Sequence, residues 1–137
     1  MVRDLLPEDV LKSLERGQLA PVYLFYGPGE FWLEKVLDRI RENLIPESAR
    51  DFNLEIFYGD EADPLDIINR ARSVPFMARN RLMIVRRTEK FGTTALERLL
   101  PYFEEPVEST CLIFITSKTD FKKKFYSRIR TSGRAVN

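Results

Sequence analysis

The chain has 137 residues, of which 44% are hydrophobic and 31% are charged, a balance that fits one soluble globular domain. It contains no histidine, and its one cysteine, Cys111, lies in an apolar run, so zinc sites and Ser-His or Cys-His nucleophiles are excluded. No apolar stretch approaches the ~20 residues of a membrane span, and the amino terminus is too charged for a signal peptide. We therefore expect a cytoplasmic protein that binds neither a membrane nor a metal.

The formal net charge is only +1, but the charges are unevenly distributed along the chain. Residues 1–66 hold 15 acidic and 7 basic side chains, whereas residues 67–137 hold 6 acidic and 15 basic ones. A basic half of this kind indicates contact with nucleic acid or with an acidic protein. The alternative is a domain with one acidic and one basic solvated flank, and composition alone does not separate the two.

An amphipathic helix near residues 7–16, ended by Gly17, opens the chain. Short apolar runs follow it, and most are continuous rather than alternating, which is typical of strands covered on both faces. These predicted strands lie at residues 21–26, 54–58, 81–86, 111–116 and 133–136.

Helical patterns fill the intervals between these strands. Residues 29–44 carry an apolar stripe with charged residues on the opposite face. The Asp-Pro pair that opens residues 63–71 is a typical helix start. The sequence TALE at residues 94–97 is a capping box that begins the next helix. Apolar spacing over residues 121–129 indicates a final helix, which the glycine at 133 ends.

Strand and helix thus alternate four times after the opening helix. Parallel strands need crossover connections, which are right-handed and place helices on the faces of the sheet. We therefore expect a three-layer α/β fold with a mostly parallel five-stranded sheet, forming a single domain over residues 1–137. Because the chain stops directly after the last short strand, we expect it to be an amino-terminal fragment of a longer protein.

The first predicted strand leads into a glycine-containing turn that resembles a phosphate-binding loop. A functional loop reads G-x-x-x-x-G-K-[ST], in which the lysine neutralises phosphates and the hydroxyl holds Mg²⁺. Counting from Gly27, the second glycine position is Trp32, the lysine position is Leu33 and the hydroxyl position is Glu34. A carboxylate at that position would repel a polyphosphate, and Leu33 belongs to the apolar stripe of the helix.

Two further requirements of a nucleotide site also fail. The G-x-G-x-x-G pattern begins with Gly27 and Gly29 but has Trp32 where the third glycine is needed. The acid that holds Mg²⁺ after a later strand is missing, because RLMIV continues into Arg86 and Arg87. The sequence predicts a degenerate phosphate loop with no bound cofactor and no ATP hydrolysis. Weak anion binding at the amides of the helix start stays open.

The segment ARSVPFMARNR, residues 71–81, separates a predicted helix from a predicted strand. Pro75 ends the helix and favours extended geometry at Val74, and Phe76 and Met77 follow directly. Four arginines flank them, at positions 70, 72, 79 and 81. Either Phe76 is a core plug under the end of the sheet, or it is a protruding anchor for an apolar pocket on an acidic partner.

The segment KTDFKKKFYSRIR, residues 118–130, is the most basic part of the chain. Helical spacing directs its apolar residues inward and Lys122, Lys123 and Arg130 toward solvent. This pattern indicates either a solvated helix face or weak, salt-sensitive contact with DNA or another partner. A basic DNA-binding or scaffolding module of a larger complex is therefore the competing hypothesis for the whole chain.

Several motifs together resemble those of the amino-terminal domain of the delta subunit of the bacterial DNA polymerase III clamp loader. In the family's order, and within residues 20–136, they are PVYLFYGPGEFWLEKVLDRIRENL, DFNLEIFYGDEAD, ARSVPFMARNRLMIVRRTEKF, LERLLPYFEEPVESTCLIFITSK and TDFKKKFYSRIRTSGRAV. The resemblance implies an AAA+-like fold that has lost its ATP site, as Leu33 and Glu34 indicate independently.

The resemblance also implies a role and a set of partners. The family's first domain grips the ring-shaped sliding clamp, the beta subunit, and helps open one ring interface during DNA replication. Sister subunits, delta prime and tau/gamma, complete the clamp loader and supply ATP hydrolysis, and contact with DNA is indirect. The implied protein is thus a non-hydrolysing subunit of a holoenzyme that is a DNA-directed DNA polymerase, a nucleotidyltransferase.

In this family the gripping element is a hydrophobic pair, commonly leucine-phenylalanine, in the loop before the third strand. Aligned through ARNRLMIV, that pair falls on Pro75 and Phe76. Because proline replaces leucine here, we expect Val74 or Met77 to supply the second anchor.

Overall fold

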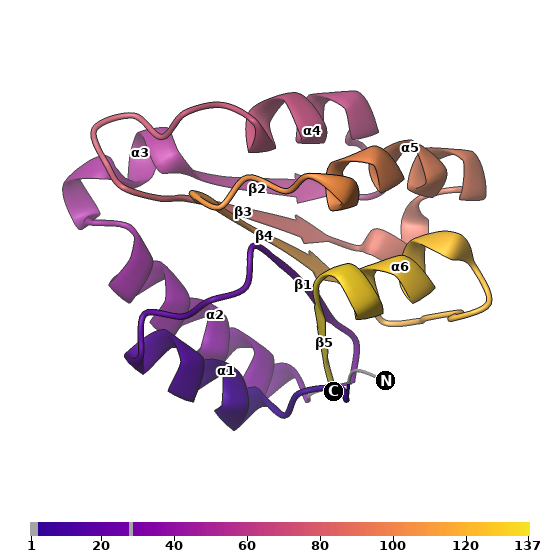
Figure 1. The fold of residues 1–137 in the computed structure, drawn as a ribbon, viewed down its shortest axis with the longest axis horizontal. Helices are drawn as coiled ribbons and strands as arrows, with labels where there is room; N and C mark the ends of the chain where they lie inside the picture. The colour runs from indigo at the N-terminus through magenta and orange to yellow at the C-terminus, as the bar shows by residue number, and fades with distance from the viewer. Residues whose placement is uncertain (1–2, 28) are drawn as a thin grey trace.

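A computed structural model describes residues 3–27 and 29–137 and shows a five-stranded sheet between two layers of helices (Figure 1). The strands are β1 (Val22–Phe25), β2 (Leu54–Tyr58), β3 (Arg81–Arg86), β4 (Thr110–Ile115) and β5 (Arg134–Val136). Their order across the sheet is β2-β3-β4-β1-β5, and all four neighbouring pairs are parallel. The expected α/β sheet is confirmed, and it is parallel throughout rather than mostly parallel.

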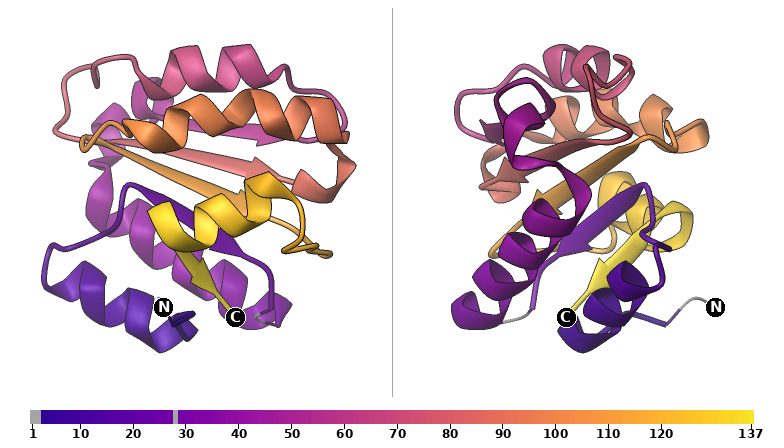
Figure 2. Two further views of the ribbon diagram at one scale, coloured as in Figure 1. Left: turned by 45° about the vertical axis from the view of Figure 1, so that its right-hand side comes forward. Right: turned by 90° about the vertical axis from the view of Figure 1, so that its left-hand side faces the viewer.

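Helices cover both faces of this sheet, as the two views of Figure 2 show. The five predicted helices are present as α1 (Pro7–Glu15), α2 (Glu30–Leu44), α4 (Pro64–Ala71), α5 (Thr93–Glu104) and α6 (Lys124–Ser132). Residues of α1 and α2 pack in one hydrophobic core, and residues of α4, α5 and α6 pack in the other. The three-layer arrangement is therefore confirmed.

The strands supply side chains to both cores, which explains their continuous apolar runs. In β1, Val22 and Leu24 pack against α4, α5 and α6, whereas Tyr23 and Phe25 pack on the side of α1 and α2. Successive side chains of a strand point to opposite faces, so a strand covered on both sides must be apolar at every position.

Three short helical segments were missed by sequence reasoning: η1 (Glu47–Ala49), α3 (Arg50–Asn53) and η2 (Thr88–Lys90). A helix of one turn has no repeating apolar stripe and does not form alone, because nucleation is unfavourable without tertiary contacts. The turn formed by η1 and α3 (residues 47–53) becomes important below.

Two predicted helix starts are wrong and one is confirmed. The TALE box does not cap α5, which begins at Thr93 after Gly92 with no side-chain cap. The last helix begins at Lys124 rather than near Phe121, because the Asp120 carboxylate accepts a hydrogen bond from the Lys122 amide and forms a turn instead. At the start of α4, Asp63 accepts a hydrogen bond from the Leu65 amide at 2.9 Å, as predicted.

Candidate functional site

The parallel sheet has two chemically different edges. All five strands begin at one edge, called here the amino edge, and end at the other, the carboxyl edge. The degenerate phosphate loop follows β1 and lies at the carboxyl edge, whereas the loop of residues 72–80 precedes β3 and lies at the amino edge, beside α3 (Figure 1). The two sequence-predicted sites are therefore at opposite ends of the molecule.

At the carboxyl edge, α2 begins at Glu30 with Gly29 as its amino-terminal cap, and Pro28 lies outside the described residues. Leu33 is half-buried and packs against the core shared with α1, so its assignment to the apolar stripe is confirmed. Gly27 is closely approached by the side chain of Asn137, and a β-carbon at Gly27 would collide with it. The backbone of the loop therefore leaves little space on that side.

Glu34 forms an ion pair with Arg86, the last residue of β3. One Arg86 nitrogen, Nη2, lies 2.8 Å from Glu34 Oε1 and 3.0 Å from Oε2. In a nucleotide-hydrolysing relative of this fold, a hydroxyl would occupy position 34 and an acid would follow a later strand, and together they would hold Mg²⁺. Here the acid is on the helix and the cation is on the strand, so the charges neutralise each other.

At the amino edge, the loop before β3 exposes three apolar side chains. Val74 is 84% exposed, Met77 is 83% exposed and Phe76 is 53% exposed, while Pro75 is half-buried. The interpretation of Phe76 as a buried core plug is therefore wrong. Met77 also has a φ of +54°, a left-handed conformation that is uncommon for residues other than glycine.

The backbone of Phe76 is held by the fully buried side chain of Asn53. The Asn53 Oδ1 accepts a hydrogen bond from the Phe76 amide at 2.7 Å, and Nδ2 donates to the Phe76 carbonyl at 2.6 Å. The same Nδ2 donates to the Ala49 carbonyl at 3.0 Å. The loop is thus bonded to the turn of residues 47–53, although 23 residues separate the two partners.

Buried Arg81, at the start of β3, provides a second support. Its guanidinium lies 3.4 Å from the carbonyls of both Val74 and Phe52, and 3.2 Å from the carboxylate of Glu55. Glu55 also pairs with Arg70 at 3.4 Å. The role of these side chains was not predicted, because nothing in the sequence marks Asn53, and Arg81 was noted only as one of the four arginines that flank the loop.

The four arginines that flank the loop do not form a uniform ring of free cations. Arg70 and Arg81 share Glu55, and Arg72 donates to the Glu105 carbonyl at 2.9 Å and lies over the Tyr102 ring. Arg79 is exposed. The loop of residues 72–80 itself carries two arginines and no acid, whereas the neighbouring segments carry acids such as Glu55 and Glu108.

The basic segment near α6 is arranged differently from the prediction. Lys122 and Lys123 are exposed as expected, whereas the side chain of Arg130 is only 34% exposed. Its guanidinium donates to Asp4 at 2.9 and 3.1 Å, donates to the Tyr26 hydroxyl at 3.2 Å, and lies 3.4 Å from the centre of the Phe121 ring. Arg130 therefore joins the amino-terminal segment to α6, because the half-buried Asp4 needs a cationic partner.

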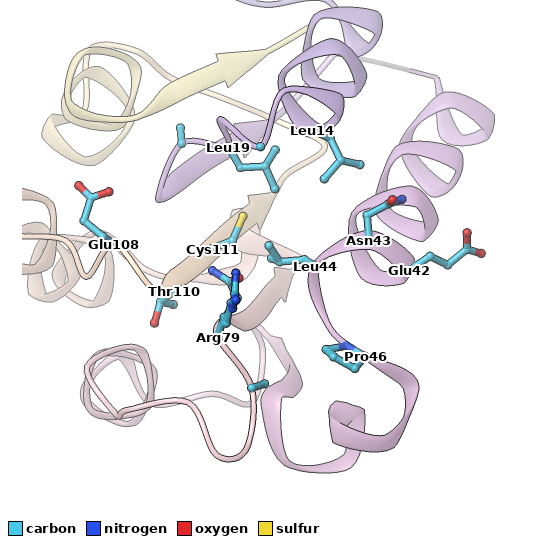
Figure 3. Close-up of a pocket in the computed structure, with 14 residues that line it drawn as sticks. Leu14, Leu19, Glu42, Asn43, Leu44, Pro46, Arg79, Glu108, Thr110 and Cys111 are labelled. Atoms are coloured by element: carbon cyan, nitrogen blue, oxygen red, sulfur yellow. The ribbon is translucent and has the colours of Figure 1, made fainter.

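A cavity of about 800 Å³ opens at the amino edge, beside the same loop, whose last residues, 78–80, line it (Figure 3). Leu14 and Leu19 line one side, Arg79 and Pro46 line the opposite side, and Cys111 lies between them. Burial raises the pKa of the Cys111 thiol to about 12, so this group stays protonated and unreactive at neutral pH. In the described ranges 3–27 and 29–137, no three His, Cys, Asp or Glu side chains are grouped so as to hold a metal ion.

None of the helices in these same ranges has the length and apolar character required to cross a membrane.

Two tyrosines of the core, Tyr102 in α5 and Tyr126 in α6, have phenol pKa values raised by burial. Tyr126 lines a separate pocket of about 460 Å³ together with Glu89 and Lys123. The strongest candidate for function is still the loop at the amino edge, because it exposes three apolar side chains.

The strand order β2-β3-β4-β1-β5, with a glycine-containing turn between β1 and α2, defines the class: an AAA+-type α/β domain with a degenerate phosphate loop. Two solved structures support the fold alone. They are a DNA polymerase III gamma subunit-related protein of Thermotoga maritima (TM-score 0.62, 17% identity, 96% of this chain and 45% of that one) and a T. maritima RuvB mutant (TM-score 0.55, 14% identity, 95% and 43%).

Sequence comparison identifies the family within this class. The sequence model described as DNA polymerase III, delta subunit, matches residues 23–136, and the chain belongs to that family. DNA polymerase III subunit delta of Bacillus subtilis is 34% identical over 136 residues. The solved B. subtilis DNA clamp loader delta protein is 28% identical, with a TM-score of 0.85 over 96% of this chain. The chain spans 38% of the first relative and 42% of the second.

Proposed function

We propose that this chain is the clamp-binding domain of a delta-type clamp-loader subunit that acts in DNA replication in the cytoplasm. It binds the sliding clamp, the beta subunit, through Val74, Pro75, Phe76 and Met77, and it helps open the ring for loading onto DNA. The observation that carries this proposal is the exposed Phe76 side chain on a loop whose backbone is held by a buried side chain.

The geometry of the loop suits an anchor that enters a pocket on another protein. Asn53 already orders the backbone of Phe76 before binding, so less conformational entropy is lost on association. An aromatic anchor in a fully desolvated pocket contributes on the order of 2 kcal/mol or more to binding. The two arginines of the loop favour a pocket with an acidic rim.

Ring opening follows if the domain binds the open clamp better than the closed one, because a ligand shifts a conformational equilibrium only by its differential affinity. The domain itself does not hydrolyse ATP in this proposal. The ion pair between Glu34 and Arg86 supports this, since it occupies both positions whose side chains would hold Mg²⁺ in a nucleotide-hydrolysing relative. Delta prime and tau/gamma subunits are the proposed partners that supply hydrolysis.

The test is the affinity of the protein for the sliding clamp, measured by calorimetry for Phe76→Ala. We expect Kd to rise about 30-fold or more, the equivalent of 2 kcal/mol. Phe31→Ala is the matched control, because Phe31 is also an exposed phenylalanine but lies at the carboxyl edge. An unchanged Kd for a folded Phe76→Ala protein would contradict the proposal.

A second candidate function is non-specific DNA binding by the basic segment. Lys122, Lys123 and Lys124 are consecutive and exposed, and they have no salt-bridge partner among the described residues. Titration with duplex and single-stranded DNA near physiological salt separates the two functions, since lysine–phosphate contacts weaken steeply with salt. Sub-micromolar DNA binding without clamp binding would favour this alternative.

A further inference from the structure

We propose that the turn of residues 47–53 forms the second half of the docking site. Phe52 is the second apolar anchor of that site, and Asn53 is the residue that positions the first anchor, Phe76. This inference rests on the proposed function, since it names further residues of the same site. It replaces Val74 and Met77, the residues that sequence comparison favoured as the second anchor.

Phe52 and Phe76 form one exposed aromatic pair at the amino edge. Their ring centroids are 5.2 Å apart with an interplanar angle of 60°. Phe52 is 57% exposed, slightly more than Phe76, so each ring keeps roughly half of its surface in contact with solvent. A pair of rings at this distance presents a larger continuous apolar surface than either ring alone, and aromatic residues supply much of the binding energy at protein interfaces.

The alternatives for the second anchor have weaker support. Pro75 is half-buried, so little of its ring is available to a partner. Val74 and Met77 are exposed, but their small or flexible side chains bury less rigid area than an aromatic ring. Phe52 is the residue that the fold brings directly against Phe76.

Both aromatic residues stand on backbone that buried side chains hold in place. Asn53 makes two hydrogen bonds to the backbone of Phe76 and a third to Ala49. Arg81 lies within 3.4 Å of the carbonyls of Phe52 and Val74. Because Asn53 directly follows Phe52 in the chain, its hydrogen bonds to Phe76 also set the distance between the two rings.

The occupant to which this surface is complementary is the sliding clamp, and the charges indicate the chemistry of its pocket. Arg70, Arg72 and Arg79 flank the segment that carries Phe76, whereas the turn that carries Phe52 has two exposed acids, Glu47 and Asp51. We therefore infer a pocket wide enough for two rings, apolar inside, with carboxylates at its rim.

The first experiment compares Phe52→Ala, Phe76→Ala and the double variant in binding to the sliding clamp. We expect Phe52→Ala to raise Kd about tenfold, and the double variant to lose less than the product of the two single effects, because the rings are in contact. Phe31→Ala is again the control, with an unchanged Kd expected.

The outcomes of this experiment separate the two levels of the proposal. If Phe76→Ala weakens binding and Phe52→Ala does not, the second anchor is wrong while the proposed function stands. If neither variant weakens binding, the proposed function itself fails. If Phe52→Ala leaves the clamp affinity unchanged but abolishes a dimer seen in sedimentation, the aromatic pair is a self-association surface and the inference is overturned.

The second experiment tests Asn53 as a positioning residue through Asn53→Ala, alone and with Phe76→Ala. We expect a five- to tenfold rise in Kd for the single variant and almost no further loss in the Phe76→Ala background, because Asn53 acts only through Phe76. The Phe76 amide should exchange with solvent at least tenfold faster. An equal loss of affinity in both backgrounds would show a general structural role and overturn the assignment.

If Asn53→Ala does not fold, Asn53→Asp takes its place. It keeps the acceptor for the Phe76 amide but removes the donor to the Phe76 and Ala49 carbonyls. The same criteria apply: loss of affinity that depends on Phe76 supports the inference, and loss that does not depend on Phe76 contradicts it.

Discussion

The two edges of this sheet have opposite properties, although both are built from the same parallel strands. In open α/β sheets, ligands usually bind at the carboxyl ends of the strands. Here Leu33, Glu34 and Arg86 occupy that edge with a core leucine and an ion pair, and the amino edge presents Phe52 and Phe76 to solvent. The comparison teaches that a few side chains can close one edge and expose apolar rings at the other while the sheet is retained, and the proposed function places recognition at the second edge.

The physical support also differs between the edges. The pair of Glu34 and Arg86 is partly exposed, so its contribution to stability is small. The amino edge is supported by buried Asn53 and nearly buried Arg81, whose hydrogen bonds are shielded from water. We therefore expect substitutions at the amino edge to have larger effects on both binding and stability.

The largest effect is expected when the whole loop is replaced. Substituting residues 74–77 by Gly-Ser-Gly-Ser removes all the exposed apolar side chains of the loop together with its proline, and we expect at least a 100-fold loss of clamp affinity in surface plasmon resonance. A replacement of the same composition at residues 60–63, which join β2 to α4 at the carboxyl edge, is the control. Equal losses in the two proteins would remove the distinction between the edges.

The next largest effect concerns stability, through Arg81→Met. This change leaves the carbonyls of Val74 and Phe52 without their donor, whereas Glu55 keeps Arg70 as a partner. We expect a loss of about 2 kcal/mol in the free energy of unfolding, measured with urea, because two carbonyl groups lose their hydrogen-bond donor where water has little access. A change below 0.5 kcal/mol would mean that Arg81 does not support the amino edge.

Raising the pH tests how the buried Cys111 thiol at the amino edge contributes to the free energy of unfolding. Burial raises the pKa of Cys111 from 9.0 to about 12, so the folded chain keeps a proton that the unfolded chain loses. The stability that this group contributes is complete well below pH 9 and falls as the pH rises toward 12, by about 1.4 kcal/mol at pH 10.

Tyr23 contributes in the same direction at a higher pH, because burial raises its pKa from 10.0 to about 12. Chemical denaturation between pH 8 and 10.5, with Cys111→Ala as the comparison, measures the part due to the thiol. We expect a flatter pH profile for the variant, and identical profiles would contradict the role of Cys111.

A smaller effect is expected at the carboxyl edge. Glu34→Ala and Arg86→Ala should each lower the free energy of unfolding by less than 1 kcal/mol, since the pair is partly exposed. A double-mutant cycle with both changes isolates the pair itself. Clamp affinity should stay unchanged, and a tenfold loss with either variant would show that this edge also takes part in docking.

The smallest effect is expected from a partial restoration of the nucleotide site. Leu33→Lys with Glu34→Thr returns the lysine and the hydroxyl, but Arg86 still occupies the end of β3 where an acid would hold Mg²⁺. We expect no ATP turnover above background in a phosphate-release assay. Turnover by the double variant would mean that the loss of the site is less complete than the ion pair indicates.

Much of the fold could be predicted because its signals are local. Continuous apolar runs predicted the five strands, and the stripe that contains Leu33 predicted α2. The sequence TALE at residues 94–97 was misleading as a capping box, since it lies inside α5, which begins at Thr93 with Gly92 as its cap. The short turn of residues 47–53 had no local signal at all, because four-residue helices are stabilised by their contacts and not by their own sequence.

The candidate site was predictable only in part. Proline next to Phe76 and Met77 indicated an exposed loop, but the direction of Phe76 was undecided until its exposure was known. The ion pair of Arg130 was not predicted, because nothing in a helical pattern reveals a partner as distant in the chain as Asp4. Residue type and spacing identify side chains that could contact a partner. The packing of distant segments decides which of those side chains stay exposed.

The sequence by itself determined the alternation of strands and helices, the loss of the lysine and hydroxyl at positions 33 and 34, and the apolar loop near Pro75. The tertiary structure alone decided three pairings: Glu34 with Arg86 across 52 residues, Asn53 with Phe76 across 23, and Asp4 with Arg130 across 126. The physical reason is range. Apolar periodicity and helix caps act within a few residues, whereas hydrogen bonds and ion pairs form wherever the topology of the sheet brings two segments together.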